Sequence, residues 1–193
     1  MKKENLTPKE SLQLIAEVID EARNRFEENG FVFAFWGALI ATASTGQFLL
    51  LKGGHYSINW YPYLLMPLGA IVTWIYYAKK KKGKPVNLVT RIVAMSWNII
   101  AFNLIVLGFV YGDKLKQNLI PVILILLAVG IWTSAVAVKS KLLYFSAIFV
   151  NIAALISFYV ERMYQPLLMG AVAFIAVFVP GIILIIQNKQ KNV

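Results

Sequence analysis

The stretch from Trp74 to Arg91, WIYYAKKKKGKPVNLVTR, places five lysines within six positions, and long apolar segments flank it on both sides. About 20 consecutive apolar residues are enough for one helix to cross the ~30 Å hydrocarbon core of a bilayer. Lysine and arginine accumulate in the short cytoplasmic turns between such helices. The stretch therefore predicts a helical membrane protein and indicates which side of it faces the cytoplasm.

Composition supports this reading. Hydrophobic residues make up 59% of the 193 residues and charged residues only 15%, whereas soluble domains are ~45–50% apolar. A soluble fold of this length could not bury so much apolar surface. We therefore expect an all-α integral membrane protein.

Six apolar segments of suitable length follow a polar N-terminal region, and short polar joints separate them, so neighbouring spans must be antiparallel. This predicts an amphipathic helix within residues 1–30, a six-span domain over residues 31–187 and a basic tail over residues 188–193. The predicted spans are Phe31–Leu51, Tyr61–Ala78, Leu88–Tyr111, Leu119–Val138, Leu142–Val160 and Leu167–Ile186.

Charge gives the orientation. If residues 1–30 are cytoplasmic, the segments on that side hold fifteen of the nineteen lysines and arginines. This split follows the positive-inside rule. It predicts that both termini lie inside, and we expect the protein in the cytoplasmic (inner) membrane of a bacterium.

The lysine run is most simply a topological anchor, and binding of anionic lipid can coexist with that role. A joint so close to the bilayer leaves little room for a duplex, so we expect no nucleic-acid partner. The candidate lipid-headgroup contacts are Lys79, Lys80, Lys81, Lys82 and Lys84.

The N-terminal region opens with Thr7-Pro8-Lys9-Glu10, which has the pattern of a helix N-cap with a capping box. Apolar residues then recur at helical spacing along one face, and the other face is acidic. Asn29-Gly30 predicts the helix end, because glycine readily adopts the left-handed conformation there. The candidate partner contacts on the apolar stripe are Ile15, Ile19 and Phe26.

Two interpretations of this helix remain open. Its acidic residues could pack toward the basic loops at Lys79–Lys84 and Lys139/Lys141, with burial of the apolar stripe supplying most of the energy. Alternatively, a partner protein covers the stripe, or a second copy does.

The predicted spans contain no Asp, Glu or His, and the chain has no cysteine. Coupled transporters usually need an intramembrane carboxylate or histidine, and phosphoryl-transfer enzymes need acids to hold a metal ion. The single histidine, His55, lies in a loop and makes no metal site alone. We therefore expect no enzyme activity, no metal and no cofactor.

Five residues are candidates for a polar path or ligand contacts: Arg91, Trp97, Asn98, Asn103 and Asn151. Arg91 and Asn98 are seven residues apart, so they share one helical face. The asparagines could line a path, or they could form hydrogen bonds between helices. Arg91 could contact an anionic group, or it could extend toward the headgroups.

Gly37, Ala41 and Thr45 form a small-residue face in the first predicted span. Such spacing allows close approach of a second helix. The sequence leaves open whether that helix belongs to the same chain or to a second copy.

The spans also show a weak repeat. Trp36 and Phe48 in the first span have the same spacing as Trp97 and Phe109 in the third. Three tandem helical hairpins would produce this pattern, and so would the ordinary punctuation of a six-span protein.

The segment LTPKESLQLIAEVIDEARNRFEENGFVFAFWG, which begins at Leu6, resembles the opening of small multi-span bacterial membrane proteins. The resemblance covers mainly residues 6–48. It implies a membrane location and no particular site.

Taken together, these features predict a non-catalytic membrane protein that acts through contacts, as a scaffold, a regulator or an accessory subunit of a transporter. The expected partners are membrane lipids and possible protein contacts through the N-terminal helix or the Gly37/Ala41/Thr45 face. The alternatives are an uncoupled channel or carrier for a small neutral or anionic solute, and a lipid-binding membrane protein.

Overall fold

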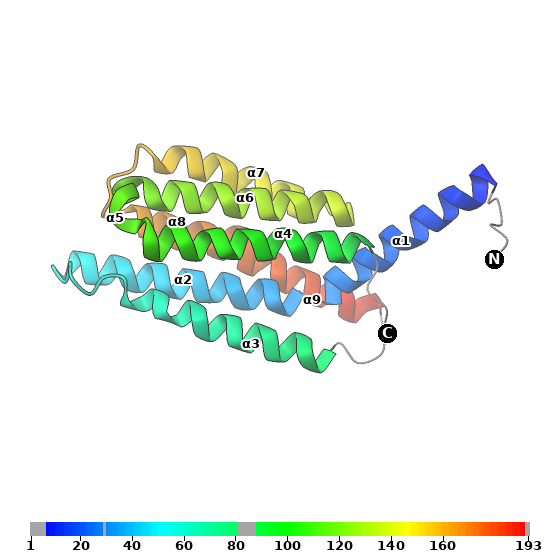
Figure 1. The fold of residues 1–193 in the computed structure, drawn as a ribbon, viewed down its shortest axis with the longest axis horizontal. Helices are drawn as coiled ribbons and strands as arrows, with labels where there is room; N and C mark the ends of the chain where they lie inside the picture. The colour runs from blue at the N-terminus through cyan, green and yellow to red at the C-terminus, as the bar shows by residue number, and fades with distance from the viewer. Residues whose placement is uncertain (1–6, 29, 81–87, 192–193) are drawn as a thin grey trace.

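The computed structural model describes residues 7–28, 30–80 and 88–191, and every element in that part is helical (Figure 1). Short 3-10 and π-helical segments, labelled η, adjoin or interrupt the longer helices. The helices are α1 Pro8–Glu28, α2 Gly30–Lys52, α3 Leu65–Lys80, α4 Leu88–Ile105, α5 Gly112–Leu115, α6 Leu119–Val138, α7 Lys141–Ser157, α8 Gln165–Ala173 and α9 Val179–Lys191; the turns are η1 Tyr61–Leu64, η2 Val106–Val110, η3 Lys116–Asn118 and η4 Phe174–Phe178.

Each of the six predicted apolar segments is mostly helical, and α6 has the predicted bounds. Four helices of the described chain are long and apolar enough to cross a membrane: Gly30–Lys52, Arg91–Val110, Gly112–Val138 and Gln165–Gln187. Lys141–Ser157 is a shorter apolar helix. The described part of the chain is therefore all-helical, and its helix lengths and composition are consistent with a membrane protein.

Most of the buried core lies on the hairpin of α6 and α7. Lys139 ends α6 in the left-handed conformation, with φ 50° and ψ 40°, and the amide of Ser140 donates to the carbonyl of Ala135 at 3.2 Å. This arrangement satisfies the last carbonyls of α6 and reverses the chain within two residues. Fully buried side chains such as Leu124, Ile131, Leu143 and Val150 then fill the space between the two helices and their neighbours.

Helix α2 packs against α8, η4 and α9 through glycine contacts. A Cβ atom placed on Gly37 would lie 2.4 Å from the backbone nitrogen of Phe178, and one on Gly181 would lie 2.3 Å from that of Ala34. Only glycine allows backbones to approach this closely. The small-residue face at Gly37 and Ala41 is thus covered by helices of the same chain.

Gly30 differs from the expectation for it. Helix α1 ends at Glu28, close to the expected stop, but Gly30 is the first residue of α2 and is buried against Gly181 and Leu184. Among the described residues only Gly54 is a glycine with positive φ. Gly30 is therefore a packing glycine and not a left-handed helix stop. Asn29, the other half of the expected stop, lies outside the described residues.

Two tryptophans link consecutive helices in the same way. The indole nitrogen of Trp36 on α2 donates to the hydroxyl of Thr73 on α3, and that of Trp97 on α4 donates to the hydroxyl of Ser134 on α6, both at 2.9 Å. Each hydroxyl in turn donates to a glycine carbonyl four residues earlier, that of Gly69 at 2.8 Å and that of Gly130 at 2.9 Å. Each tryptophan therefore meets a partner hydroxyl that its own helix already orients.

The two links are equivalent in sequence as well as in geometry. Trp97, Gly130 and Ser134 each lie 61 positions after Trp36, Gly69 and Thr73. The glycines also contact matching side chains, because a Cβ atom on Gly69 would lie 2.5 Å from Leu39 and one on Gly130 would lie 2.9 Å from Ile100. The α2–α3 and α4–α6 hairpins are thus two copies of one packing unit.

The third helical pair is held differently. The side-chain amide of Gln165 at the start of α8 is buried and donates to the carbonyls of Ser157 and Val160, at 3.0 and 3.2 Å. These bonds cap the C-terminal end of α7 and fix the following turn. The weak repeat seen in the sequence thus corresponds to two matching hairpins followed by a different one.

Candidate functional site

The three deep asparagines lie on the outer surface of the bundle. Asn98 and Asn103 on α4 and Asn151 on α7 are all exposed, and so is Arg91 at the start of α4. The structure does not bring them together around an internal path. Trp97 points the other way: it is half-buried, bonds Ser134 and meets the ring of Phe33 edge-on at 6.4 Å between centroids.

The asparagines differ in their hydrogen bonds. The side-chain nitrogen of Asn103 donates to the carbonyl of Ile99, one turn earlier, at 2.9 Å. Asn98 and Asn151 make no side-chain hydrogen bond to any residue that the structure describes. An unpaired amide in hydrocarbon costs free energy until it finds a partner. Asn98 and Asn151 are therefore the two deep amides that remain available for contacts outside the chain.

The interior carries few polar side chains, and they are small or locally bonded. Within the described ranges, the buried polar residues are Ser44, Ser134, Ser146, Ser157 and Gln165. Ser134 and Ser157 each donate to a carbonyl of their own helix, at 2.9 and 2.6 Å. The core around them is aliphatic, so its side chains give a solute little to bind.

A polar network at one end of α2 was not expected as a unit. The hydroxyl of Tyr63 donates to the side-chain oxygen of Gln47 at 2.9 Å, and the Gln47 nitrogen donates to Asn59 at 3.0 Å. Ser44 lies 3.3 Å from the same tyrosine hydroxyl, and Asn59 also donates to the backbone of Tyr56. The network joins the loop 53–60 to α2. Gln47 and Ser44 are visible in the sequence as polar span residues, but their partners in the loop are not.

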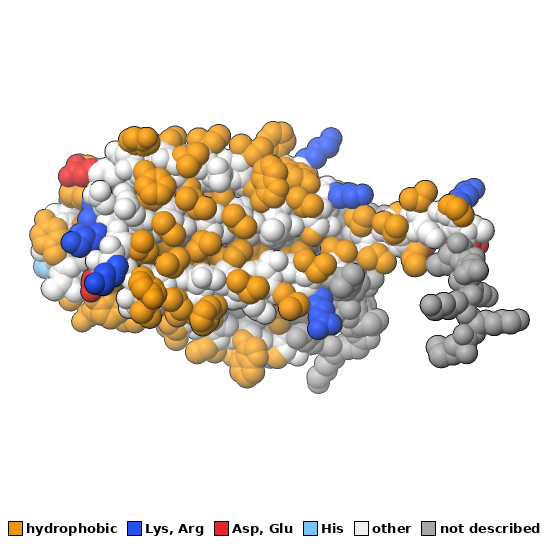
Figure 2. All heavy atoms as spheres, turned by 45° about the horizontal axis from the view of Figure 1, so that its top comes forward, with side chains coloured by type: hydrophobic (Ala, Val, Ile, Leu, Met, Phe, Trp, Pro, Cys, Tyr) orange, Lys and Arg blue, Asp and Glu red, His pale blue; other side chains and the backbone are white. Residues whose placement is uncertain are grey.

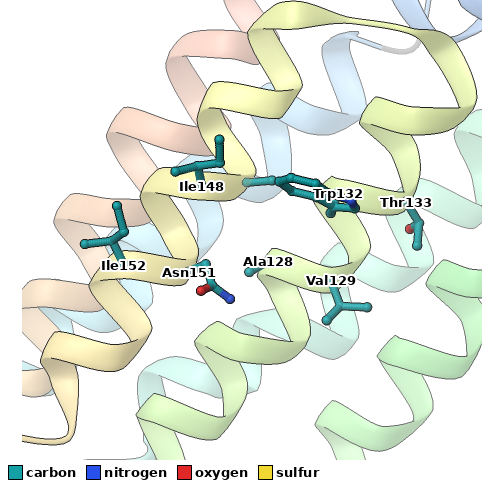
Figure 3. Close-up of a pocket in the computed structure, with 8 residues that line it drawn as sticks. Ala128, Val129, Trp132, Thr133, Ile148, Asn151 and Ile152 are labelled. Atoms are coloured by element: carbon teal, nitrogen blue, oxygen red, sulfur yellow. The ribbon is translucent and has the colours of Figure 1, made fainter.

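An open groove of about 360 Å³ runs between α6 and α7 on the outside of the bundle (Figure 3). The side chain of Asn151 points across it toward Ala128, and Trp132 lies over the other end. Apolar side chains dominate the walls, so the groove offers an apolar body with one amide. The lining residues are Ala128, Val129, Trp132, Thr133, Ala147, Ile148, Asn151 and Ile152.

A basic hollow lies at the loop end of the bundle. Lys114, Lys116 and Arg162 line a space of about 300 Å³ together with Leu115, Gln117 and Asn118. Lys116 has a positive φ of 48°, so the loop is locally strained. These cations are three of the four that the charge argument places outside, and they gather at one point.

The lysine run is only partly within the described chain. Lys79 is exposed at the end of α3. The side chain of Lys80, and Lys81, Lys82 and Lys84, lie outside the described residues. The predicted headgroup contacts therefore remain a prediction.

Helix α1 projects from one end of the bundle (Figure 1). The capping box is formed: the amide of Thr7 donates to the Glu10 carboxylate at 2.7 Å, and the amide of Glu10 donates to the Thr7 hydroxyl at 3.3 Å. The Thr7 hydroxyl also donates to the Glu10 carboxylate, at 2.9 Å. The two bonds to the carboxylate lower the pKa of Glu10, first the one from the Thr7 amide and then the one from its hydroxyl.

The apolar stripe of α1 is largely uncovered. Leu12 is 67% exposed and Ile15 is 56% exposed, whereas Ile19 is half-buried. The side chain of Phe26 lies outside the described part. The first half of the stripe is therefore exposed, because α1 extends past the end of the bundle (Figure 1). Packing of its acidic residues toward the basic loops stays a prediction.

No group of three or more His, Cys, Asp or Glu side chains that could hold a metal ion occurs within residues 7–28, 30–80 and 88–191. Comparison with protein-family models, with curated proteins and with solved structures gave no match. The surfaces described above therefore carry the functional argument.

Proposed function

We propose that this chain is a non-catalytic, six-span membrane protein that acts through contacts with other membrane components. One observation carries the proposal: the deep polar side chains that could serve a solute lie on the outside of the bundle, and the interior is aliphatic. A channel or carrier would need such groups around an internal path. A protein that works by contact needs them on its surface.

The membrane location is supported by the surface. Figure 2 shows hydrophobic side chains over the middle of the bundle and charged groups gathered at its ends. Large apolar side chains such as Trp74, Ile99, Phe102 and Phe145 are exposed. A band of this kind is far larger than the apolar patches of soluble monomers, and a bilayer accounts for it.

Six spans are the count that fits the helices best. The segment from Tyr61 to Lys80 and the helix α7 are not among the four long apolar helices, but both are apolar, and each runs along the bundle beside the other helices (Figure 1). With the lysines on the cytoplasmic side, both termini lie inside. We place the protein in the cytoplasmic (inner) membrane.

Orientation has a direct test, because the chain contains no cysteine. We expect single cysteines at Ser57 and Lys141 to react with a membrane-impermeant thiol reagent from opposite sides of sealed vesicles, with Ser57→Cys reached from the periplasmic side. Labelling of both positions from one side would contradict the six-span arrangement.

The exposed half of α1 is the proposed contact element for a protein outside the bilayer. Leu12 and Ile15 present apolar surface beside acidic residues such as Glu17. Burial of such a stripe contributes about 1.5–3 kcal/mol per large side chain. A partner with an apolar groove and a basic rim would match it.

The test is recovery of bound proteins from native membranes by mild detergent. Ile15→Glu should lose the bound protein, because it places a charge in the contact. Gln13→Glu is the matched control, since Gln13 is also exposed but off the stripe, and it should retain the protein. Equal recovery with both variants, or solute flux through proteoliposomes that contain the purified chain, would contradict the proposal.

The groove between α6 and α7 supports a second candidate, a lipid-binding protein. Its volume of about 360 Å³ and its apolar walls suit part of an acyl chain, and the Asn151 amide could bond a carbonyl of the lipid. Native mass spectrometry should then detect a lipid that survives delipidation in the original chain and is lost in Asn151→Leu. Identical lipid retention in both would exclude this use of the groove.

A further inference from the structure

The two matching hairpins assign a role to the outer face of α4. Because the two hairpins are 61 positions apart in the sequence, each residue of the α2 packing face has a counterpart 61 positions later on α4. On α2 that face lies against α8, η4 and α9. Its residues are Gly30, Ala34, Gly37, Ala41 and Ser44, and the counterparts on α4 are Arg91, Met95, Asn98, Phe102 and Ile105.

All five counterparts are exposed, with Met95, Phe102 and Ile105 at 54%, 67% and 59%. Much of α4 is exposed, so exposure alone does not single out this face. The correspondence with α2 does: the five residues, at alternating steps of four and three, occupy the positions with which α2 packs along its neighbours. The face lies opposite Ile100 and Trp97, which attach α4 to α6.

Asn98 is the central residue of this face and the only uncharged polar one. Its side chain has no hydrogen bond to any described residue, although Asn103 on the same helix is bonded to Ile99. An amide carries both donors and acceptors, so two asparagines can satisfy each other. A single asparagine within an apolar seam is also the feature that sets register between paired helices.

The way the chain inserts into the membrane favours a second copy as the partner that covers this face. All copies of one chain enter a membrane with the same orientation, because their lysines are distributed identically. Two copies related by a two-fold axis along the membrane normal therefore present Asn98 at the same depth. An unrelated partner would have to supply an amide or hydroxyl at that depth by coincidence.

We infer that the Arg91/Met95/Asn98/Phe102/Ile105 face of α4 is a self-association surface, covered by the same face of a second copy, with the two Asn98 amides bonded to each other. The inference rests on the membrane location proposed above. The two Arg91 side chains lie at the helix start, where the headgroups can separate and solvate them. The surface would make the protein a symmetric dimer with both α1 helices on one side.

Disulfide scanning in native membranes tests the surface, since every introduced cysteine would be the only one in the chain. Met95→Cys, Phe102→Cys and Ile105→Cys lie on the face and should form dimers on mild oxidation. Ile92→Cys and Asn103→Cys are the controls, because both positions are exposed on α4 but point about 100° or more away from the face. Equal dimer formation at all five positions would indicate random collision and overturn the inference.

The amide has its own test in the Met95→Cys background. Asn98→Leu should weaken association roughly three- to twentyfold, the range expected for one hydrogen bond between membrane helices. Asn98→Gln should keep most of it. Asn103→Leu is the matched control and should change association little, because that amide is already bonded within its helix. Unchanged dimerisation in Asn98→Leu would overturn the pairing.

Alkaline carbonate extraction separates this inference from the proposal beneath it. Monomers alone in a membrane-retained protein would overturn self-association and leave the membrane proposal intact. Release of the chain from the membrane fraction would overturn both. Oxidative capture of a different protein at Met95→Cys, without the dimer, would overturn the choice of a second copy as the occupant.

Discussion

Helices α2 and α4 occupy equivalent places in two matching hairpins, yet one face of α2 is covered by other helices and the matching face of α4 is exposed. Both carry a tryptophan that bonds a hydroxyl on the following helix, at 2.9 Å in each case. The face of α2 is built on Gly30, Ala34 and Gly37, and the chain's own last helices cover it. The same face of α4 carries larger side chains and is exposed.

The difference shows what side-chain size decides in a membrane protein. Lipid and protein are equally apolar, so hydrophobicity does not choose which face of a helix packs. Glycine allows backbones to touch, and α2 therefore forms a dense contact within the chain. Methionine and phenylalanine keep neighbours at a distance, and on α4 one amide provides the specificity instead.

The largest effect is expected when a glycine on the covered face of α2 is replaced by a large side chain of the kind found on α4. Gly37→Leu should destabilise the protein by more than about 3 kcal/mol, because the new Cβ atom would meet the backbone of Phe178 at 2.4 Å. Unfolding in detergent against increasing SDS measures the loss.

Gly108→Ala is the control for that change. It lies on the helical segment that continues α4, and a Cβ atom there would meet nothing within 4 Å. It should leave stability unchanged or raise it by about 0.5–1 kcal/mol. Similar unfolding of the Gly37→Leu protein and the original chain would show that the α2 contact is looser than the structure has it.

The second prediction tests whether the tryptophan–hydroxyl bond stabilises both hairpins. Ser134→Ala should cost about 1–2 kcal/mol, because it leaves the half-buried indole N–H of Trp97 without its partner and Ser134 itself is fully buried. Thr73→Val should cost less, since Thr73 is only partly buried whereas Ser134 is fully buried. Each change can also be combined with replacement of its partner tryptophan in a double-mutant cycle, measured by the same unfolding assay. The cycle should show that the two residues of each pair are energetically coupled.

Thr133→Val is the matched control for this pair. Its hydroxyl donates only to Gly130 of its own helix, at 2.9 Å, so its loss should change stability by less than about 0.5 kcal/mol. A cost equal to that of Ser134→Ala would mean that the link between helices is not what stabilises the hairpin.

The helices themselves were predictable from the sequence, and their partners were not. Hydropathy alone gave α6 its bounds of Leu119 and Val138, because apolar runs end where charges begin. The small-residue face at Gly37 was also visible. Its partner was not, since nothing local to α2 points to Phe178, which is far away in the chain.

The asparagines illustrate the same limit. Asn98, Asn103 and Asn151 were recognisable as the deepest amides, but a helix that is apolar on every side gives no sign of which face points inward. The left-handed conformation expected at Gly30 was wrong for a related reason: Gly181, from a helix far along the chain, packs against Gly30 and fixes its place. The match between Trp36 and Trp97 was the one long-range signal in the sequence, and its partner hydroxyls emerged only in the fold.

The smallest expected effect is a pH dependence of the first turn of α1, which α2 and α4 should not show. Glu10 has its pKa lowered from its ordinary value of 4.5 by the bonds to Thr7, so these bonds favour the ionised carboxylate. The cap is therefore fully present above that ordinary value and is lost as the pH falls through the lowered pKa of the folded state. Amide hydrogen exchange in the first turn of α1 should accelerate as the pH falls through that value, whereas α2 and α4, which contain no Asp, Glu or His, should not respond.

Glu10→Gln keeps a side chain that can accept the same bond but does not titrate, so it should remove the pH dependence. If the first turn of that variant loosened at the same pH, the titrating group would lie elsewhere, and the contrast between a pH-sensitive α1 and a pH-insensitive pair of hairpins would need another cause.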